Sequence, residues 1–360
     1  MPSEKDFIPS DYKNTVEKSR FAWSAPSNIA LVKYWGKKQN QIPANPSVSF
    51  TLSNCKTITS LDFEKKESNG ISFDLLFEGQ PKEDFKPKIA KFFERVQQYV
   101  PFIHNYHFTI DTQNTFPHSS GIASSASGMA ALAMNIMSLE RELNPDMDDT
   151  YFYSKASFMA RLGSGSACRS VKGKVVIWGE HKEITGSTDL FGVELPDAIH
   201  ENFKNYQDTI LLVDKGEKQV SSTVGHDLMH NHPFAIQRFE QAHTNLSAIR
   251  QALVNGDIKK FIEITESEAL TLHAMMMTSL PCFILMKPNT LAIINTIWAY
   301  RKSTGTPVCF TLDAGANVHV LYPEEYKEKV LQFIKNELVG YCQNSQYICD
   351  ETGNGALQLI

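Results

Sequence analysis

Small and hydroxyl-bearing residues gather between positions 117 and 128, where the chain reads Pro-His-Ser-Ser-Gly-Ile-Ala-Ser-Ser-Ala-Ser-Gly. Apolar residues at helical spacing follow, so we predict a helix that begins near Ser125 and reaches Leu139. Backbone N–H groups at a helix start are unpaired and lie at the positive end of the helix dipole, and Gly121 lets a phosphate approach the backbone. Ser and Gly also form ordinary caps and turns, so this loop predicts either a phosphate site or a plain helix cap.

Three further segments place charged side chains beside glycines, serines or strand ends. Lys33 follows an apolar, strand-like run and Lys37 follows a glycine, so both can reach an anion. Arg169 follows the sequence Gly-Ser-Gly-Ser at 163–166, which offers backbone and hydroxyl donors beside a planar guanidinium. Asp313 ends an apolar strand beside a glycine turn, a common position for a catalytic carboxylate.

Each of these segments also has an ordinary structural interpretation. The lysines can be surface residues, the Gly-Ser-Gly-Ser run can be a helix C-cap with a solvated arginine behind it, and Asp313 can form an Asx turn. Together, however, they supply two anion-binding loops, an arginine, two lysines and a carboxylate, a set that suits phosphoryl transfer. The chain lacks the Gly-x-x-x-x-Gly-Lys-Ser/Thr motif of P-loop NTPases, and no Gly-x-Gly-x-x-Gly follows a strand, which argues against a dinucleotide oxidoreductase.

Strand-like and helical segments follow one another without a strict alternation, so an α+β fold is favoured over a doubly wound sheet. We expect strands at 24–32, 47–63 (more than one), 71–77, 106–110, 174–178, 209–213, 306–311 and 318–321. We expect helices at 85–100, 125–139, 151–162, 233–268 (two, interrupted at 255–257), 291–303 and 324–338. A boundary near residue 200 divides the chain into a polar extension at 1–20, an N-terminal domain at 21–200 and a C-terminal domain at 201–360.

The composition narrows the class of protein. Of the 360 residues, 42% are hydrophobic and 21% are charged, which predicts a well-packed core. The formal net charge is −5 and no long basic run occurs, so we expect no nucleic-acid partner. Six scattered cysteines without CxxC spacing indicate reduced thiols. The polar start of the chain lacks the apolar segment of a signal peptide and no apolar run is long enough to span a bilayer, so we expect a cytoplasmic protein without membrane contact.

Taken together, the motifs resemble one family. The segment 117–126 resembles the phosphate-binding motif of the GHMP kinase superfamily, and four segments in order resemble its diphosphomevalonate decarboxylases. These segments are Asn28-Ile29-Ala30 with Lys33-Tyr34-Trp35-Gly36-Lys37, Gly121-Ile122-Ala123-Ser124-Ser125-Ala126, Gly163-Ser164-Gly165-Ser166-Ala167-Cys168-Arg169-Ser170, and Asp313-Ala314-Gly315-Ala316-Asn317. The third is close to diagnostic, and the resemblance extends over about residues 24–320.

The resemblance implies a two-lobed GHMP-kinase-like fold. Its N-terminal lobe would be similar to ribosomal S5 domain 2, its C-terminal lobe would be ferredoxin-like, and the site would lie in the cleft. The implied reaction is the ATP- and Mg²⁺-dependent decarboxylation of mevalonate 5-diphosphate to isopentenyl diphosphate, with ADP, phosphate and CO₂. Phosphorylation of the 3-hydroxyl comes first, and loss of that phosphate and of CO₂ forms the double bond. A homodimer is implied as well.

The resemblance also implies roles for individual residues. Asp313 matches the family's aspartate that orients or deprotonates the 3-hydroxyl. Arg169 matches the arginine that holds the substrate carboxylate, and Lys33 matches a lysine that offsets developing negative charge. Asn28 is their hydrogen-bonding neighbour. The residues that match groups around the substrate and its diphosphate are Tyr34, Lys37, Ser164, Ser166 and Thr223. Those that match the ATP site are Ser119, Ser120, Gly121, Ala123, Ser124 and Ser125, with Ser124 expected at Mg²⁺.

The chain departs from the family pattern in three places. Asn45-Pro46-Ser47 stands where Asn-Ser-Ser is usual, and His118-Ser119-Ser120 where Thr-Ala-Ala is common. An arginine assigned to the diphosphate is expected near residues 79–81. Only lysines occur close to that turn, and the nearest arginine is Arg95; the lysines are Lys82, Lys86, Lys88 and Lys91. Decarboxylation of mevalonate 5-phosphate, or 3-phosphorylation of mevalonate alone, therefore stay as alternatives, although the combination of Lys33, Arg169 and Asp313 favours full decarboxylation.

Overall fold

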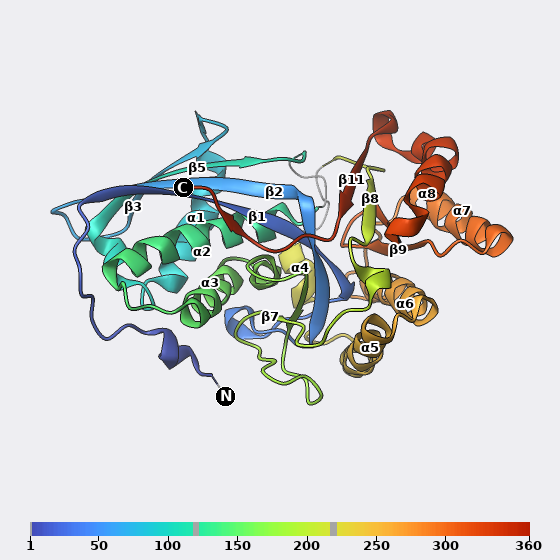
Figure 1. The fold of residues 1–360 in the computed structure, drawn as a ribbon, viewed down its shortest axis with the longest axis horizontal. Coiled ribbons are helices and arrows are strands. Elements are labelled where there is room, and N and C mark those ends of the chain that lie inside the picture. The colour runs from blue at the N-terminus through green and yellow to red at the C-terminus, as the bar shows by residue number, and fades with distance from the viewer. Residues whose placement is uncertain (1, 118–121, 217–221) are drawn as a thin grey trace.

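The computed structural model describes residues 2–117, 122–216 and 222–360. Within these residues the strands form two sheets, one of eight strands and one of four, and helices pack against both (Figure 1). This arrangement confirms the predicted α+β class. No helix among the described residues combines the length and the apolar character needed to cross a membrane.

The larger sheet is built on two long antiparallel strands, β1 (Lys18–Val32) and β2 (Ser47–Lys65). Its strand order is β12-β1-β2-β5-β3-β4, and β6 and β7 extend it from the start of β2. The remaining strands are β3 (Ser72–Phe77), β4 (Gln80–Pro81), β5 (Tyr106–Asn114), β6 (Val175–Trp178), β7 (Val193–Glu194) and β12 (Leu357–Gln358).

Three helices cover one face of this sheet: α1 (Lys86–Val96), α2 (Ser124–Leu143) and α3 (Asp149–Gly163) (Figure 1). The central helix, α2, lies against β1 and β2 with nearly all of its small and apolar side chains buried. Because α2 is held so firmly, its first turn is a rigid support for the loop that precedes it.

The smaller sheet has the order β11-β8-β10-β9, and all its neighbouring strands are antiparallel. These strands are β8 (Gln207–Leu211), β9 (Cys309–Leu312), β10 (Val318–Tyr322) and β11 (Tyr347–Glu351). The helices that follow β8 in the chain are α4 (Ser222–Asp227), α5 (Ala235–Asn255), α6 (Ile258–Met277), α7 (Pro288–Thr304) and α8 (Lys327–Phe333). Helix α6 packs on β9 and also reaches the end of β1, so it links the two sheets (Figure 1).

Most predicted elements are confirmed, but several bounds differ: β1 begins at Lys18 rather than at residue 24, and α6 continues to Met277 rather than ending at residue 268. The region 47–63 forms the single strand β2 rather than several strands, although its register with β1 shifts between Pro26 and Asn28. The helix predicted to reach residue 100 ends at Val96; Pro101 disfavours the helical conformation at the residue before it, and Val100 has φ −135° and ψ 62°.

Other differences lie near the two ends of the chain. The last predicted helix, 324–338, is broken into a 3₁₀ turn, α8 and a π-helical turn at Ile334–Leu338. Strands β11 and β12 follow it and were not predicted. In the polar N-terminal segment, Phe7 is buried and stacks on Phe158, so one apolar residue anchors a segment whose composition is otherwise polar.

The C-terminal segment returns from the smaller sheet to the larger one, where β12 pairs with β1 (Figure 1). On this path the carboxylate of Asp350 in β11 accepts three backbone hydrogen bonds from β2. The donors are the N–H groups of Ser53, Asn54 and Cys55, at 2.9, 2.8 and 2.7 Å. Asp350 is buried, and this one side chain pairs with N–H groups of β2 for which the described residues offer no partner strand.

We expect Asp350→Asn to lower the free energy of unfolding by about 2–3 kcal/mol, because an amide has one acceptor oxygen and its NH₂ group opposes the strand's N–H groups. Urea denaturation of the purified chain measures the change. Asp62→Asn is the matched control: its carboxylate is exposed beside Arg20 at 3.7 Å, and we expect a change below about 0.5 kcal/mol. Equal effects in the two variants would contradict this role of Asp350.

Candidate active site

Lys33 and Asp313 form an ion pair where the two sheets meet. Lys33 directly follows β1 of the larger sheet, and Asp313 directly follows β9 of the smaller one. The Lys33 Nζ lies 3.3 Å from the Asp313 Oδ1 and also donates to the Ala30 carbonyl at 2.6 Å. Lys33 is buried, whereas the Asp313 side chain is 30% exposed, so the carboxylate is the accessible half of the pair. Burial lowers the pKa of Lys33 below its ordinary value, and the Asp313 carboxylate opposes that shift.

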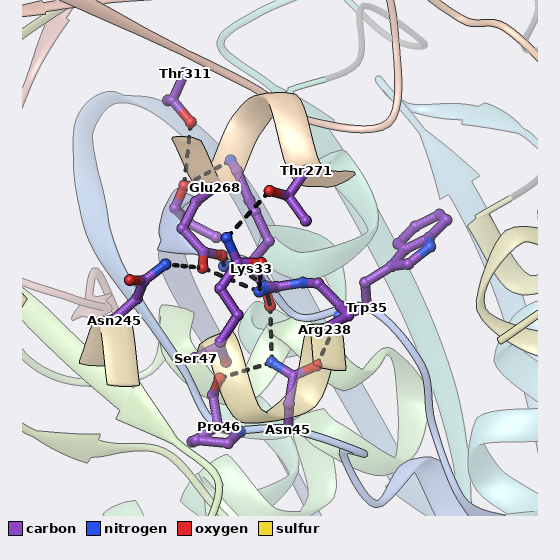
Figure 2. Close-up of polar contacts among 12 residues, drawn as sticks. Lys33, Trp35, Asn45, Pro46, Ser47, Arg238, Asn245, Glu268, Thr271 and Thr311 are labelled. Atoms are coloured by element: carbon purple, nitrogen blue, oxygen red, sulfur yellow. Dashed lines mark hydrogen bonds and ion pairs between the residues drawn. The ribbon is translucent and has the colours of Figure 1, made fainter. Parts of the chain in front are cut away.

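A second, fully buried ion pair holds the backbone of Lys33 (Figure 2). Arg238 of α5 donates to both carboxylate oxygens of Glu268 of α6, at 3.0 and 2.6 Å. Glu268 in turn accepts the Lys33 N–H at 2.8 Å, and Arg238 donates to the Lys33 carbonyl at 3.1 Å. Asn45 and Asn245 complete the network, the first by donating to the Lys33 carbonyl at 2.9 Å and the second by donating to Glu268 at 2.7 Å. Both peptide groups of Lys33 are thus fixed by charged partners.

Arg169 is a buried cation whose hydrogen-bond partners in the described part of the chain are all neutral. Its Nε donates to the Ser49 hydroxyl at 2.8 Å and to the Asn28 Oδ1 at 3.4 Å, and its Nη1 donates to the Ser47 hydroxyl at 2.6 Å. Asn28 is itself oriented, since its amide nitrogen donates to the Ser166 carbonyl and the Ser170 hydroxyl. Among the described residues no carboxylate lies within ion-pair distance of Arg169. Burial lowers the pKa of Arg169, so an anion bound here would relieve an unfavourable state.

The start of α2 lies beside the Gly-Ser-Gly-Ser loop. Ser124 and Ser125 form the first turn of α2, and the Ser125 hydroxyl is 3.2 Å from the Ser164 hydroxyl. Ala123, just before the helix, has a left-handed φ of 45°. The two predicted anion-binding loops are therefore adjacent in space. Ser119, Ser120 and Gly121 lie outside the described residues, and so does the side chain of Thr223.

A cavity of about 240 Å³ opens next to this helix start. Ser124, Ser125 and Gly128 of α2 form one side of it, and residues of α1 and of strands β2, β3 and β5 form the rest. The principal apolar contributors are Leu75, Phe77, Phe85, Ile89, Ile110 and Met129. An apolar cavity beside an anion-binding helix start suits a ligand with a flat apolar part and a phosphate chain.

Tyr34 belongs to an aromatic wall that packs against Gly165 of the Gly-Ser-Gly-Ser loop. Its ring lies 4.6 Å from that of Trp178 and 4.2 Å from that of His226, measured between centroids. Gly165 packs so closely on this wall that an added Cβ would lie 2.9 Å from the Tyr34 hydroxyl, so this position requires glycine. Lys37 lies nearby, with its Nζ 3.6 Å from Asp227.

The lysines after residues 79–81, where an arginine was expected, have different surroundings, and Arg95 contacts the backbone before the Gly-Ser-Gly-Ser loop. Lys82 and Lys86 form surface pairs with Asp84 and Glu83, whereas Lys88 lines the apolar cavity. The guanidinium of Arg95 on α1 donates to the Leu162 carbonyl at 2.7 Å, directly before the Gly-Ser-Gly-Ser loop. Arg95 therefore stabilises the backbone at the start of that loop, although Arg95 and Leu162 lie 67 residues apart in the sequence.

Comparison with known proteins assigns the family. A sequence profile described as the diphosphomevalonate decarboxylase-like N-terminal domain matches residues 25–189, and one described as the mevalonate 5-diphosphate decarboxylase C-terminal domain matches residues 209–357. The chain belongs to the diphosphomevalonate decarboxylase family. Diphosphomevalonate decarboxylases of Debaryomyces hansenii and Candida albicans are each 31% identical to it, over 86% of this chain and 81% and 86% of their own lengths.

Solved structures of diphosphomevalonate decarboxylases share the fold. The mevalonate diphosphate decarboxylase of Staphylococcus aureus superposes with a TM-score of 0.81 at 26% identity, covering 95% of this chain and 98% of its own. The complex of MDDEF with MVAPP, AMPPCP and magnesium superposes with a TM-score of 0.80 at 28% identity, covering 95% and 99%. The family resemblance and the GHMP-kinase-like fold predicted from the sequence are thereby confirmed.

Four buried residues around this decarboxylase-family site were missed in the sequence. Arg238 and Glu268 could have been found, because each occupies a position of the apolar stripe on its helix; the buried stripe of α5 continues through Ala242, Leu246, Ile249 and Leu253. His226 and His273 carry no such signal. His273 donates from Nε2 to the Asp313 carbonyl at 3.1 Å, and burial lowers its pKa to about 4, so it holds Asp313 as a neutral imidazole.

We expect Glu268→Gln to lower the free energy of unfolding by about 3–5 kcal/mol, because it leaves the Arg238 charge buried without a counter-charge. The matched control on the same helix is Glu263→Gln, which breaks an exposed pair with Lys260 at 3.0 Å and should cost less than about 0.5 kcal/mol. Denaturant unfolding of both variants measures the difference. A difference below about 1 kcal/mol between the two would refute the proposed role of the buried pair.

Proposed function

We propose that this chain catalyses the ATP-dependent decarboxylation of mevalonate 5-diphosphate to isopentenyl diphosphate, with release of ADP, phosphate and CO₂. The observation that carries the proposal is Arg169, a buried guanidinium whose partners within the described residues are neutral and which lies near the Lys33–Asp313 pair. A planar guanidinium binds a carboxylate in a bidentate manner. Membership of the diphosphomevalonate decarboxylase family supports the same assignment.

In the first step Asp313 accepts the proton of the substrate's 3-hydroxyl as that oxygen attacks the γ-phosphorus of ATP, and ADP leaves with the electron pair of the bond that joined it to that phosphorus. Lys33, whose ammonium lies 3.3 Å from the carboxylate, offsets the negative charge that develops around the oxygen. His273 and the Arg238–Glu268 pair keep these two residues in place through their backbones. Asp313 and Lys33 thus act on the hydroxyl, whereas their neighbours only position them.

In the second step the bond between C3 and its phosphorylated oxygen breaks, and phosphate leaves with that electron pair. The bond to the carboxylate then breaks as well, and its electron pair forms the carbon–carbon double bond while CO₂ is released. Arg169, oriented by Ser47, Ser49 and Asn28, holds the carboxylate until the leaving group has formed. This order prevents loss of the carboxylate before C3 can accept its electrons.

The start of α2 is proposed to hold the triphosphate of ATP, through Ser119, Ser120, Gly121, Ala123, Ser124 and Ser125. The cavity of about 240 Å³ beside Ser124 and Ser125 would take the adenine, since it is apolar and adjoins the helix start. No cluster of three acidic, histidine or cysteine side chains occurs among the described residues. Mg²⁺ commonly uses one or two protein ligands and substrate phosphates, so the Ser124 hydroxyl fits it, and the ion when bound neutralises charge on the phosphates.

The substrate's diphosphate is assigned to the opposite side of the Gly-Ser-Gly-Ser loop. We assign to the diphosphate the residues that the family resemblance named, which are Tyr34, Lys37, Ser164, Ser166 and Thr223. The 3.2 Å contact between the Ser125 and Ser164 hydroxyls supports this division, because it brings the two phosphate-bearing ligands end to end.

We also retain the proposals of a cytoplasmic location, a homodimer and a domain boundary near residue 200. All six cysteines are free thiols, four of them buried, which supports a reducing compartment.

The test is incubation of the purified chain with ATP, Mg²⁺ and mevalonate 5-diphosphate. We expect one CO₂ released for each ADP formed, with isopentenyl diphosphate as the organic product. Parallel reactions with mevalonate and with mevalonate 5-phosphate measure kcat/KM for the two alternative substrates. ADP without CO₂ would identify a kinase that stops at phosphorylation, and a higher kcat/KM with the 5-phosphate would identify a phosphomevalonate decarboxylase.

Asp313→Asn should lower kcat by about 10²–10⁴-fold, since the amide cannot accept the hydroxyl proton, while ATP binding is retained. The matched control is Asp214→Asn, which also follows a strand of the smaller sheet and also faces a lysine, Lys287, at 3.7 Å. Steady-state kinetics measures kcat of the two variants, and nucleotide titration measures their ATP binding. Near-normal kcat in Asp313→Asn would remove Asp313 from the mechanism.

A further inference from the structure

Three buried or largely buried histidines use Nδ1 in the same way but differ at Nε2. The Nδ1 of His181 accepts from the Glu183 N–H at 3.3 Å, and that of His232 from the Phe234 N–H at 3.1 Å. In both, Nε2 lies near a backbone carbonyl, that of His243 at 3.1 Å and that of Met275 at 3.0 Å. These two rings are fully satisfied by the chain itself.

His226 has the same kind of contact at Nδ1 but has no carbonyl partner at Nε2 among the described residues. Its Nδ1 accepts the Gly36 N–H at 3.0 Å, so a neutral ring must carry its proton on Nε2. Among the described residues, no acceptor lies within hydrogen-bond distance of that Nε2–H. His226 is only 8% exposed, yet its Nε2 is not among the fully buried unpaired atoms of the described residues, so this donor is accessible. A largely buried ring thus keeps one N–H available to a ligand.

The surroundings of His226 indicate what its partner would be. The ring packs between Tyr34 and Trp35, at centroid distances of 4.2 and 4.6 Å. Burial, with smaller contributions from the positive charges of Lys37 and Arg169, lowers its pKa to about 3, so the ring stays neutral near pH 7. The ring contacts Tyr34, and its Nδ1 meets the N–H of Gly36 directly before Lys37; these two residues, Tyr34 and Lys37, are among those proposed for the substrate's diphosphate, so the acceptor expected here is a phosphate oxygen.

We propose that His226 is a further binding residue of the substrate pocket, whose Nε2–H donates to a phosphate oxygen of the substrate; this rests on the proposed function. The Nδ1 contact with Gly36 sets the direction of that donor, and the ring contact also orients Tyr34. A neutral donor suits this position, since it adds a hydrogen bond to the phosphate without adding a third positive charge beside Lys37 and Arg169. His226 does not touch the reacting atoms, so its effect falls on binding.

Two substitutions separate the two ring nitrogens. In His226→Asn the side-chain oxygen can replace Nδ1 as the acceptor for Gly36, but the Nε2–H is lost. In His226→Gln the longer amide can place an N–H near the Nε2 position, but the Gly36 contact is lost. We expect His226→Asn to raise KM for mevalonate 5-diphosphate about tenfold, the loss of one hydrogen bond to a charged group, with kcat within about twofold and KM for ATP unchanged. We expect His226→Gln to raise the same KM by less than about threefold.

The control is His232→Asn, which changes a buried histidine with the same Nδ1 contact but a satisfied Nε2, and should leave both KM values unchanged. An unchanged KM in His226→Asn, an equal or larger increase in His226→Gln, or a loss confined to kcat would each overturn the proposal. Inactivity of the unaltered chain with mevalonate 5-diphosphate would instead overturn the proposed function.

A measurement on the unaltered chain covers the case in which a variant fails to fold. With ¹⁵N-labelled histidine, the Nε2–H resonance of His226 should shift when mevalonate 5-diphosphate is added without ATP, and also when inorganic pyrophosphate is added. The resonance of His232 should not move. Absence of a shift at His226 with saturating mevalonate 5-diphosphate would contradict the phosphate contact.

Discussion

The site depends on one buried ion pair, Arg238 with Glu268, because this pair holds the peptide groups on both sides of Lys33. Removing two charges from water costs several kcal/mol per ion unless each is fully hydrogen-bonded. Here the N–H and carbonyl groups of Lys33, at the end of β1, supply hydrogen bonds that Glu268 and Arg238 would otherwise lack. The ion pair and the end of the strand therefore stabilise each other. Helices α5 and α6 cannot move away from β1 without exposing an incompletely paired charge. The position of the Lys33 ammonium is thereby fixed by its backbone.

The same constraint explains why the site requires both sheets. Lys33 ends a strand of the larger sheet, and Asp313 ends a strand of the smaller one, yet their charged atoms are only 3.3 Å apart. Three buried contacts hold the sheets in that relation: the Arg238–Glu268 pair, His273 on the Asp313 carbonyl, and Asp350 on the N–H groups of β2. A site divided between two sheets can accept a nucleotide from one side and a second ligand from the other.

The sequence predicted what is local and missed what is distant. Periodicity located most helices and strands, and motif spacing singled out Lys33, Arg169 and Asp313, of which the first and the last form an ion pair in the structure. It did not predict that Glu268 binds a peptide group 235 residues earlier, or that Asp350 binds a strand 295 residues earlier. Such contacts depend on tertiary packing rather than on local pattern. Strand β11 was missed for the same reason: its sequence, Tyr-Ile-Cys-Asp-Glu, has little alternation, and it forms through pairing with β8.

The balance of charge in the site explains how it is prepared for anions before any ligand binds. Lys33 and Arg169 are buried cations, and Asp313 is the carboxylate paired with Lys33, so Arg169 has no ion-pair partner among the described residues. The two nearby histidines do not add to it, since burial lowers the pKa of His226 to about 3 and that of His273 to about 4. The positive charge of the site therefore does not change with histidine protonation near neutral pH. A carboxylate and phosphates would complete it, and the donors that meet them are already oriented, so little reorganisation accompanies binding.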